Sequence, residues 1–367
     1  MKKHIFLCSL AVPLAAGLSA CRGPQALKTS FHQYSEAYAT TVNEQMLLNL
    51  ARKANGHPAY FLQMGLINAT FSFSAAGGGN VSSSRYNNQI GPNILTQGLT
   101  GGGNLSLSGA ETPTFTFTPL AGTTYADAIF APINSKIFFN LLDQGCPVDQ
   151  LMRTMVRAIE VTYGQPGKPN KTITIRNIID VERQENYRNF LRIAGLYREL
   201  QKDELLSVGT DATGQGFAFQ PTAALKIAEL IKQPEYQLEP ESEWAAAHPE
   251  GLPTNTIPVT TLKLRTFEGV LTALATEYQT YDRVAGNGRA LLPLSERQPI
   301  LRFDAKVRND PATRLVDITY KGKKYEIADN SQTNTWNRDI FILLNHLFTQ
   351  VAIDPNKLPV QQLIQVR

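Results

Sequence analysis

Cysteine and histidine are the side chains best suited to nucleophilic, base or metal chemistry, and the chain holds three cysteines and five histidines. Neither type forms a pair at metal-ligand spacing, and a His-Glu-x-x-His sequence is absent. Cys146 lies in Gln-Gly-Cys-Pro, a turn between two expected helices, and no histidine is near it in sequence. We interpret Cys146 as a small buried residue, while pairing with a histidine through space stays open. The isolated histidines, interpreted as surface or structural residues, are His32, His57, His248 and His346.

The acidic residues and the glycine-rich segments also lack catalytic spacing. Asp203 and Glu204 are adjacent, so they face apart on a helix. An acidic loop around residues 239–243 is interpreted as solvated, with cation binding as the alternative. No phosphate-binding loop, dinucleotide fingerprint or Gly-x-Ser-x-Gly elbow occurs. The sequence therefore predicts no catalytic residue, no metal site and no cofactor.

The N-terminus has the pattern of an export signal. Lys2 and Lys3 precede a short apolar run, Ile5 to Leu18, which is too short to remain as a membrane-spanning helix. The run ends in Leu18-Ser19-Ala20-Cys21, which resembles the lipobox of bacterial lipoprotein precursors. In that family an aliphatic residue and two small residues precede the cysteine that is modified. The resemblance covers this N-terminal segment alone.

The resemblance implies a lipid anchor at Cys21. The thiol would receive a diacylglyceryl group, cleavage would follow Ala20, and the new amine would be acylated by a chain such as palmitate. One acyl chain anchors marginally, whereas three anchor firmly. Arg22 follows in place of the aspartate that retains lipoproteins at the inner membrane of enteric bacteria. We therefore expect an outer-membrane location with a periplasmic body, and no partner cysteine for Cys146.

The net charge gives no electrostatic case for binding nucleic acid. The whole chain carries a formal charge of +4, and removal of the signal would take away Lys2 and Lys3. The apolar fraction of 43% is enough for a core. These values describe a folded protein whose expected partners are a membrane, through the anchor, and other envelope proteins.

A charge-poor stretch, Asn55 to Ala126, is the most distinctive part of the chain. Between Lys53 and Asp127, Arg85 and Glu111 are the charged residues. Each end of the stretch alternates apolar and polar residues, which predicts two long strands with a glycine-rich tip, an extended hairpin. Further short strands are expected around Tyr86 to Leu99. The candidate interaction residues, which share the apolar face, are Phe71, Phe73, Leu105, Leu107, Phe115 and Phe117.

Four interpretations of this hairpin are open. It covers the protein's own helices as part of a sheet, it pairs with another subunit or partner, it inserts into the outer membrane, or it is disordered. Strands of this length and alternation fit a membrane, but a single hairpin leaves unpaired edges, so insertion requires a ring of subunits. Glu111 and Pro113 fall on the otherwise apolar face and limit insertion.

Hydrophobic periodicity elsewhere predicts an α+β fold of mixed helices and short antiparallel strands. Four segments are expected: a signal at 1–20, a tether at 21–30, a helix-plus-hairpin domain at 31–163 and an α+β domain at 172–367. The proline- and glycine-rich segment 164–171 is the expected linker. The clearest helix runs from Glu182 to Lys202, and strands are expected at 301–307, 315–320 and 324–327.

The expected function is a structural or assembly role in a bacterial envelope complex, without catalysis. One alternative is a lipid-anchored hydrolase, which requires two carboxylates about 5–9 Å apart in a cleft, or Cys146 beside a histidine. Another is a module that binds a glycan or small ligand in a pocket lined by aromatic residues such as Trp244, Trp336 or tyrosines.

Overall fold

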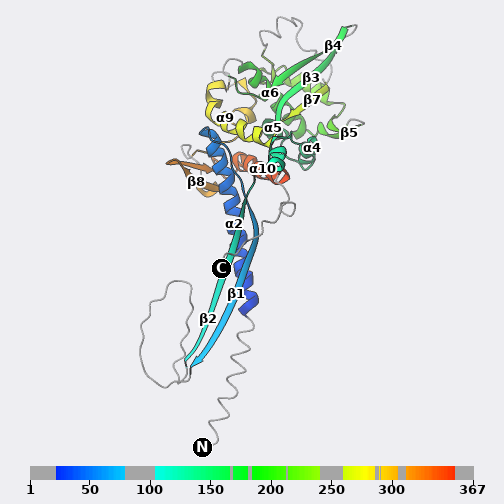
Figure 1. Cartoon of the computed structure of the whole chain (residues 1–367). Helices are drawn as coiled ribbons and strands as arrows, with labels where there is room; N and C mark the ends of the chain where they lie inside the picture. Colours follow the sequence, from blue (N-terminus) through cyan, green and yellow to red (C-terminus); the bar gives the residue numbers. More distant parts are fainter. Residues whose placement is uncertain are drawn as a thin grey trace, which may run out of the picture. The chain divides into compact units, whose positions relative to one another are not determined.

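The computed structural model describes residues 22–78, 104–165, 168–180, 184–211, 214–239, 259–285, 289, 291–304 and 311–351. These residues fall into two compact units. The described part of the body combines residues 22–59 with the described residues from 123 to 351. The described part of the hairpin unit lies between Tyr60 and Gly122. Helices combined with short antiparallel strands confirm the predicted α+β class (Figure 1).

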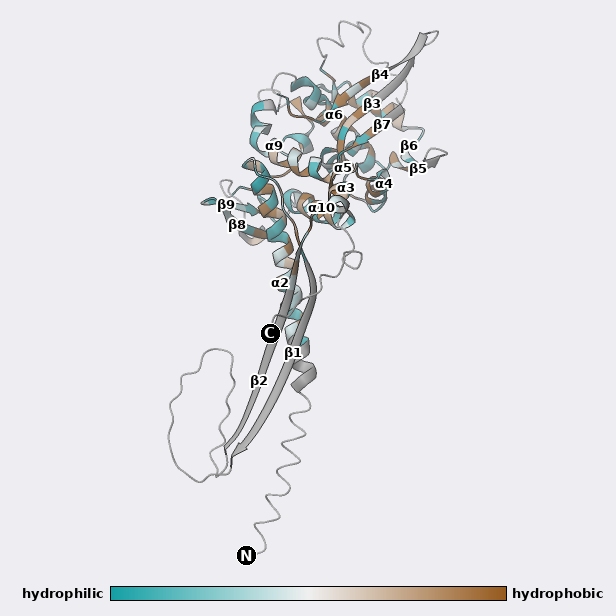
Figure 2. Cartoon of the chain, viewed as in Figure 1, coloured by the Kyte–Doolittle hydropathy of each residue, from teal (hydrophilic) through white to brown (hydrophobic). Residues whose placement is uncertain are grey.

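The described elements of the body alternate between helices and short strands. Its helices are α2 (Arg22–Ala54), α3 (Thr123–Phe130), α4 (Ser135–Asp143), α5 (Val148–Met155), α6 (Gln184–Lys202), α7 (Ala223–Leu230), α9 (Phe267–Ala285) and α10 (Trp336–Val351). Its strands are β3 (Val156–Gln165), β4 (Lys168–Arg176), β5 (Leu206–Asp211), β6 (Gly214–Phe219), β7 (Val259–Leu264), β8 (Val316–Tyr320) and β9 (Lys323–Ile327). The helices carry hydrophobic and hydrophilic residues side by side, as amphipathic helices with one buried face do (Figure 2).

The core of the body is built on the predicted apolar faces. On α6, Phe190, Ala194 and Leu200 are fully buried. On α9 and α10, Phe267 and Ile340 are likewise buried, as are their helical neighbours one turn further on. Burial of such side chains contributes about 1.5–3 kcal/mol each, which outweighs the weak helix propensity of the aromatic and β-branched residues.

Three antiparallel strands form the main sheet of the body, in the order β4-β3-β7. The central strand β3 follows α5 with no intervening loop, because Val156 is already extended at φ −93° and ψ 127°. Two smaller hairpins, β5-β6 and β8-β9, lie elsewhere in the body. The β8-β9 turn places Lys321 at φ 50° and Gly322 at φ 74°, the left-handed pair of a tight hairpin turn.

The hairpin unit confirms the predicted pair of long strands. Strand β1 (Leu62–Gly78) pairs antiparallel with β2 (Asn104–Pro119), from Leu62 opposite Pro119 to Gly78 opposite Asn104. The register shifts between Met64 and Ile67, so an irregularity interrupts the ladder near the end formed by Leu62 and Pro119. The short strands expected around residues 86–99 lie outside the described residues.

Several sequence expectations differ from the structure. The expected linker at 164–171 instead includes the end of β3 and the start of β4, which pair with each other through Gln165 and Lys168. Helix α2 begins at Arg22, within the segment expected to be a tether. The strand expected at 301–307 is irregular where it is described, with a single bridge from Asp304 to Tyr325. The prolines and glycines of residues 164–171 therefore do not mark a linker, because β3 and β4 pair with each other across this segment.

Candidate functional site

The register of the hairpin assigns the alternating residues to two faces. Ile67 lies opposite Phe115, and Ala75 lies opposite Leu107. Because successive residues of a strand belong to opposite faces, the candidate interaction residues occupy positions on one face. The other face holds Asn, Ser and Thr, together with Ala76, Ala110 and Gly78, over the regular part of the ladder. The pairing thus agrees with the alternation seen in the sequence.

Two residues interrupt the apolar face of the hairpin. Glu111 lies opposite Phe71, and Pro113 lies opposite Ala69, near the middle of the paired region. Proline has no N–H to donate to a ladder and is found at sheet edges. Phe117 lies near the end of the hairpin formed by Leu62 and Pro119, and this residue is 52% exposed.

The β1-β2 sheet consists of two strands within the described part of the chain. Each strand therefore has one edge whose backbone groups pair with no other described strand. Among the interpretations of the hairpin, the one that makes it part of a larger sheet of the body receives no support from this topology. An isolated two-stranded sheet is marginally stable in water, so such edges are available to an additional strand.

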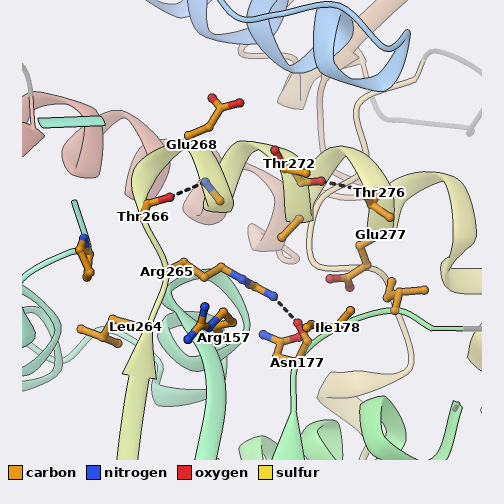
Figure 3. Close-up of a pocket in the computed structure, with 14 residues that line it drawn as sticks. Arg157, Asn177, Ile178, Leu264, Arg265, Thr266, Glu268, Thr272, Thr276 and Glu277 are labelled. Carbon is orange, nitrogen blue, oxygen red and sulfur yellow. Dashed lines mark hydrogen bonds between the residues drawn. The ribbon is translucent and has the colours of Figure 1, made fainter. Parts of the chain in front are cut away.

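A pocket of about 500 Å³ lies in the body where β7 runs into α9 (Figure 3). The end of β7, the first three turns of α9, the segment after β4 and the start of β3 all contribute to its wall. Its lining residues are Pro132, Arg157, Asn177, Ile178, Ile179, Leu264, Arg265, Thr266, Glu268, Gly269, Thr272, Ala273, Thr276 and Glu277. A volume of this size matches pockets that hold small molecules.

The base of the pocket is fixed by the way that α5 ends. A helix leaves its last backbone carbonyls without intrahelical hydrogen bonds. Because α5 passes directly into β3, donors from other segments must bind these carbonyls. Arg265 Nη1 donates to the carbonyls of Arg153 (2.7 Å) and Thr154 (3.2 Å). Asn177 Nδ2 donates to the carbonyls of Arg153 (2.9 Å) and Val156 (2.8 Å). Arg265 and Asn177 therefore form the C-terminal cap of α5.

The guanidinium of Arg265 is held with neutral partners. Its Nη2 donates to the backbone carbonyl of Asn177, as Figure 3 shows. Burial lowers the pKa of Arg265 to about 10; Glu277 opposes this shift, and the neighbouring Arg157 adds to it. The group thus keeps its positive charge at neutral pH, favourably placed at a helix C-terminus.

A buried ion network lies behind the pocket. Arg153 on α5 donates through Nη2 to Glu277 Oε1 and through Nη1 to Glu296 Oε2, the latter at 3.0 Å. All three side chains are at most 5% exposed. Burial raises the pKa of Glu296 to about 8, although Arg153 opposes the shift. When both acids are ionised, the network of one arginine and two carboxylates has one negative charge in excess. One bound proton makes the network neutral.

Sequence reasoning missed the arginines and Asn177 of this region. Arg153 lies on α5, and an arginine on a helix normally faces solvent. Its burial depends on Glu277 and Glu296, which are 124 and 143 residues away in sequence. Short-range spacing carries no signal for such a contact.

The residues singled out for chemistry lie apart from this pocket. Cys146 is half-buried, and its carbonyl accepts a hydrogen bond from Gln201 Nε2. Burial raises the pKa of the Cys146 thiol, which disfavours the reactive thiolate. His57 Nδ1 lies 2.8 Å from the Tyr320 hydroxyl, and Nε2 lies 3.1 Å from Lys321 Nζ.

The expected acidic loop and aromatic pocket also have other roles where they are described. Glu239 binds Arg188 and Arg192; although burial raises its pKa, hydrogen bonds from Arg188 and the charge of Arg192 lower it overall. Trp336 donates its indole N–H to the carbonyl of Ile300 and stacks against the Arg153 guanidinium at 5.7 Å. It does not line the pocket. Trp244, Glu241 and Glu243 lie outside the described residues.

The proposed lipidation site also lies outside the described residues, since Leu18, Ser19, Ala20 and Cys21 precede α2. In the described part of the chain, no helix is both long and apolar enough to cross a membrane. Among the same residues, no three of His, Cys, Asp and Glu come together as a group able to hold a metal ion.

Comparison of the whole chain with protein families, with characterised proteins and with solved structures found no match. Its function must therefore be argued from its own residues. Two features stand out in the described part of the chain. One is the charge-poor hairpin with its unshared edges, and the other is the arginine-containing pocket at the start of α9.

Proposed function

We propose that this chain is a lipid-anchored outer-membrane protein with a structural or assembly role in a bacterial envelope complex, without catalysis. The hairpin β1-β2 is its interaction surface, and Cys21 carries the anchor. The observation that carries the proposal is the long two-stranded sheet that pairs with no other strand in the described residues. The lipobox-like sequence at Leu18 to Cys21 supports the location.

The length of the hairpin supports an interaction role. Strand β1 has 17 residues, which corresponds to roughly 55 Å of extended chain. A hairpin of this kind is marginally stable alone, and proteins usually protect long exposed edges with charges or short strands. Here Glu111 is the sole charged residue of the two strands. A strand added to either edge would satisfy its backbone groups, so we propose strand pairing as the mode of assembly.

The partner is a second copy of the chain or another envelope protein. Insertion into the membrane would be one form of pairing between copies of this chain, because only a closed ring of hairpins satisfies all backbone groups in lipid. Glu111 and Pro113 lie on the apolar face and disfavour continuous contact with lipid. Pairing outside the membrane is therefore the form that we propose.

The rival proposal of a lipid-anchored hydrolase has less support. Two carboxylates line the pocket, but Glu268 is paired with Lys53 of α2 and Glu277 with Arg153. Acids held in this way are poorly placed to act as general acids or bases, because the ion pair restrains their geometry. Cys146, the other candidate, has a raised thiol pKa.

The test compares the detergent-extracted protein with a variant in which residues 68–116 are replaced by a short Gly/Ser linker. Light scattering of the full chain should give a mass above that of a monomer or a defined complex with an envelope protein, and the deletion should remove it. A strictly monomeric full chain with no envelope partner would refute the proposal.

A matched pair of substitutions separates edge pairing from lipid insertion. Phe73 and Ser74 are neighbours on opposite faces of β1. Insertion requires that Phe73→Glu abolish assembly while Ser74→Glu does not, since an ionised side chain that faces lipid is destabilising. Pairing outside the membrane predicts that both variants assemble, because the contacts are made by the backbone.

A further inference from the structure

The charges around the pocket are unevenly compensated. Four charged side chains line it: Arg157, Arg265, Glu268 and Glu277. Glu268 pairs with Lys53, and in Figure 3 its carboxylate points away from the pocket toward α2. Glu277 pairs with the buried Arg153. Both acids therefore form ion pairs with bases that do not line the pocket.

The two arginines form no ion pair with a described residue. Arg265 donates to three backbone carbonyls, which are neutral. Burial lowers the pKa of Arg265, the charge of Glu277 opposes this shift, and the like charge of Arg157 adds to it. Arg157 is exposed and makes no ion pair or side-chain hydrogen bond with any described residue. The pocket wall therefore presents two guanidinium groups that form no ion pair with a described residue, whereas both of its carboxylates are paired.

Polar groups beside the arginines are placed to complete an anion site. Thr266 Oγ1 accepts the N–H of Gly269 at 2.9 Å, so its own hydroxyl hydrogen is available to another acceptor. Thr266 also precedes α9, a helix of 19 residues whose N-terminal end favours negative charge. The opposite part of the lining is apolar, with Ile178, Ile179 and Leu264.

We propose that this pocket binds a small organic anion through a carboxylate or phosphate group. Arg157 and Arg265 hold the anionic group, Thr266 donates a further hydrogen bond, and the apolar part of the ligand lies against Ile178 and Leu264. A planar guanidinium matches both carboxylate and phosphate oxygens, which is why arginine is favoured in such sites. The volume of about 500 Å³ suits a small molecule. This proposal concerns the body and does not depend on the hairpin.

The test uses calorimetry on the full chain in detergent with three probes: butyrate, inorganic phosphate and the neutral butyramide. Binding of butyrate or phosphate, without binding of butyramide, is the expected result, and the stronger of the two anions identifies the acidic group. Arg157→Gln should weaken that binding by about 10- to 100-fold, the effect of losing a charged hydrogen-bond partner. Its fold should be unchanged, because the Arg157 side chain makes no hydrogen bond or ion pair with a described residue, and its backbone carbonyl, which accepts the N–H of Asn177, is retained.

The matched control is Arg283→Gln, an exposed arginine at the far end of α9, which should leave binding unchanged. Thr272→Trp provides a second variant: Thr272 is exposed and lines the pocket, so a large side chain there should block every ligand without unfolding the body. The proposal is overturned if neither anion binds at millimolar concentration, if butyramide binds as well as butyrate, or if Arg157→Gln binds like the wild type.

Discussion

Replacing Glu296 with glutamine tests the buried network around Arg153. Glu296 lies in a short turn at Leu294–Glu296, is fully buried and accepts a hydrogen bond from Arg153 Nη1 at 3.0 Å. Burial raises its pKa to about 8, against the opposing effect of Arg153, and the nearby Asp149 and Glu277 add to the increase. At neutral pH the folded protein therefore holds a proton on Glu296, and the network of one cation and two carboxyl groups is neutral.

The sign of the pH effect follows from proton binding. The ordinary value for glutamate is 4.5, so between 4.5 and 8 the unfolded chain has released this proton while the folded chain retains it. The unfolded state binds fewer protons in that window, and stability must fall as the pH rises. The full shift corresponds to about 5 kcal/mol, of which about 2 to 3 kcal/mol falls between pH 5 and pH 7.

The assay is urea unfolding of wild type, Glu296→Gln and a control, Glu44→Gln, at pH values from 5 to 8. Glutamine cannot ionise, and its amide replaces the protonated carboxyl beside Arg153 and Ser295. The stability of Glu296→Gln should therefore lack the decline of about 2 to 3 kcal/mol that the wild type shows between pH 5 and pH 7. Glu44 is exposed on α2, so its variant should follow the wild type.

Two results would refute this reasoning. If wild type and Glu296→Gln lost stability in parallel, the proton would not reside on Glu296. If Glu296→Gln were the less stable protein at pH 8, the carboxylate would be ionised in the folded state and its ion pair with Arg153 would stabilise the fold.

Three further predictions test other parts of the molecule. Gly195→Ala should lower the free energy of unfolding, measured by urea denaturation, by about 1–3 kcal/mol, because the new Cβ would lie 2.6 Å from Pro293 Cβ. The control Gly216→Ala should be tolerated, because a Cβ there meets nothing within 4 Å. Asn177→Ala should cost about 1–3 kcal/mol by that assay, because the buried carbonyl of Val156 loses its side-chain donor; an unchanged unfolding midpoint would contradict the proposed cap. Cys21→Ser should abolish acyl labelling and move the protein out of the membrane fraction, and unaltered fractionation would exclude the anchor.

Much of the secondary structure could be predicted because it depends on local patterns. The periodicity of Phe190, Ala194 and Leu200 predicted α6, and the helix buries that face. That helix was predicted from Glu182 to Lys202, and α6 spans Gln184–Lys202. Strand β6 was missed, because Gly214 and Gly216 resemble a turn and the strand is defined by its pairing with β5. A strand with little propensity of its own forms where a neighbour supplies hydrogen bonds.

The two candidate sites also differ in how far the sequence could predict them. The hairpin and its two faces could be predicted from residues 67–75 and 104–118, since alternation is a local property of a strand. The pocket could not, because Arg157, Arg265 and Asn177 come from three separate segments that meet only through the β4-β3-β7 sheet. Nothing in the spacing of these residues distinguishes them from surface arginines and asparagines.

The sequence by itself determined the amphipathic helices, the long alternating strands and the lack of short-range catalytic motifs, because periodicity and spacing act over a few residues. Tertiary structure decided which charges are compensated. Glu277 and Glu296 neutralise an arginine far away in sequence, Lys53 neutralises Glu268, and Arg157 is left without a described partner. Burial and pairing of a charge depend on what the fold brings within a few ångströms, and desolvation then sets its pKa and its availability to a ligand.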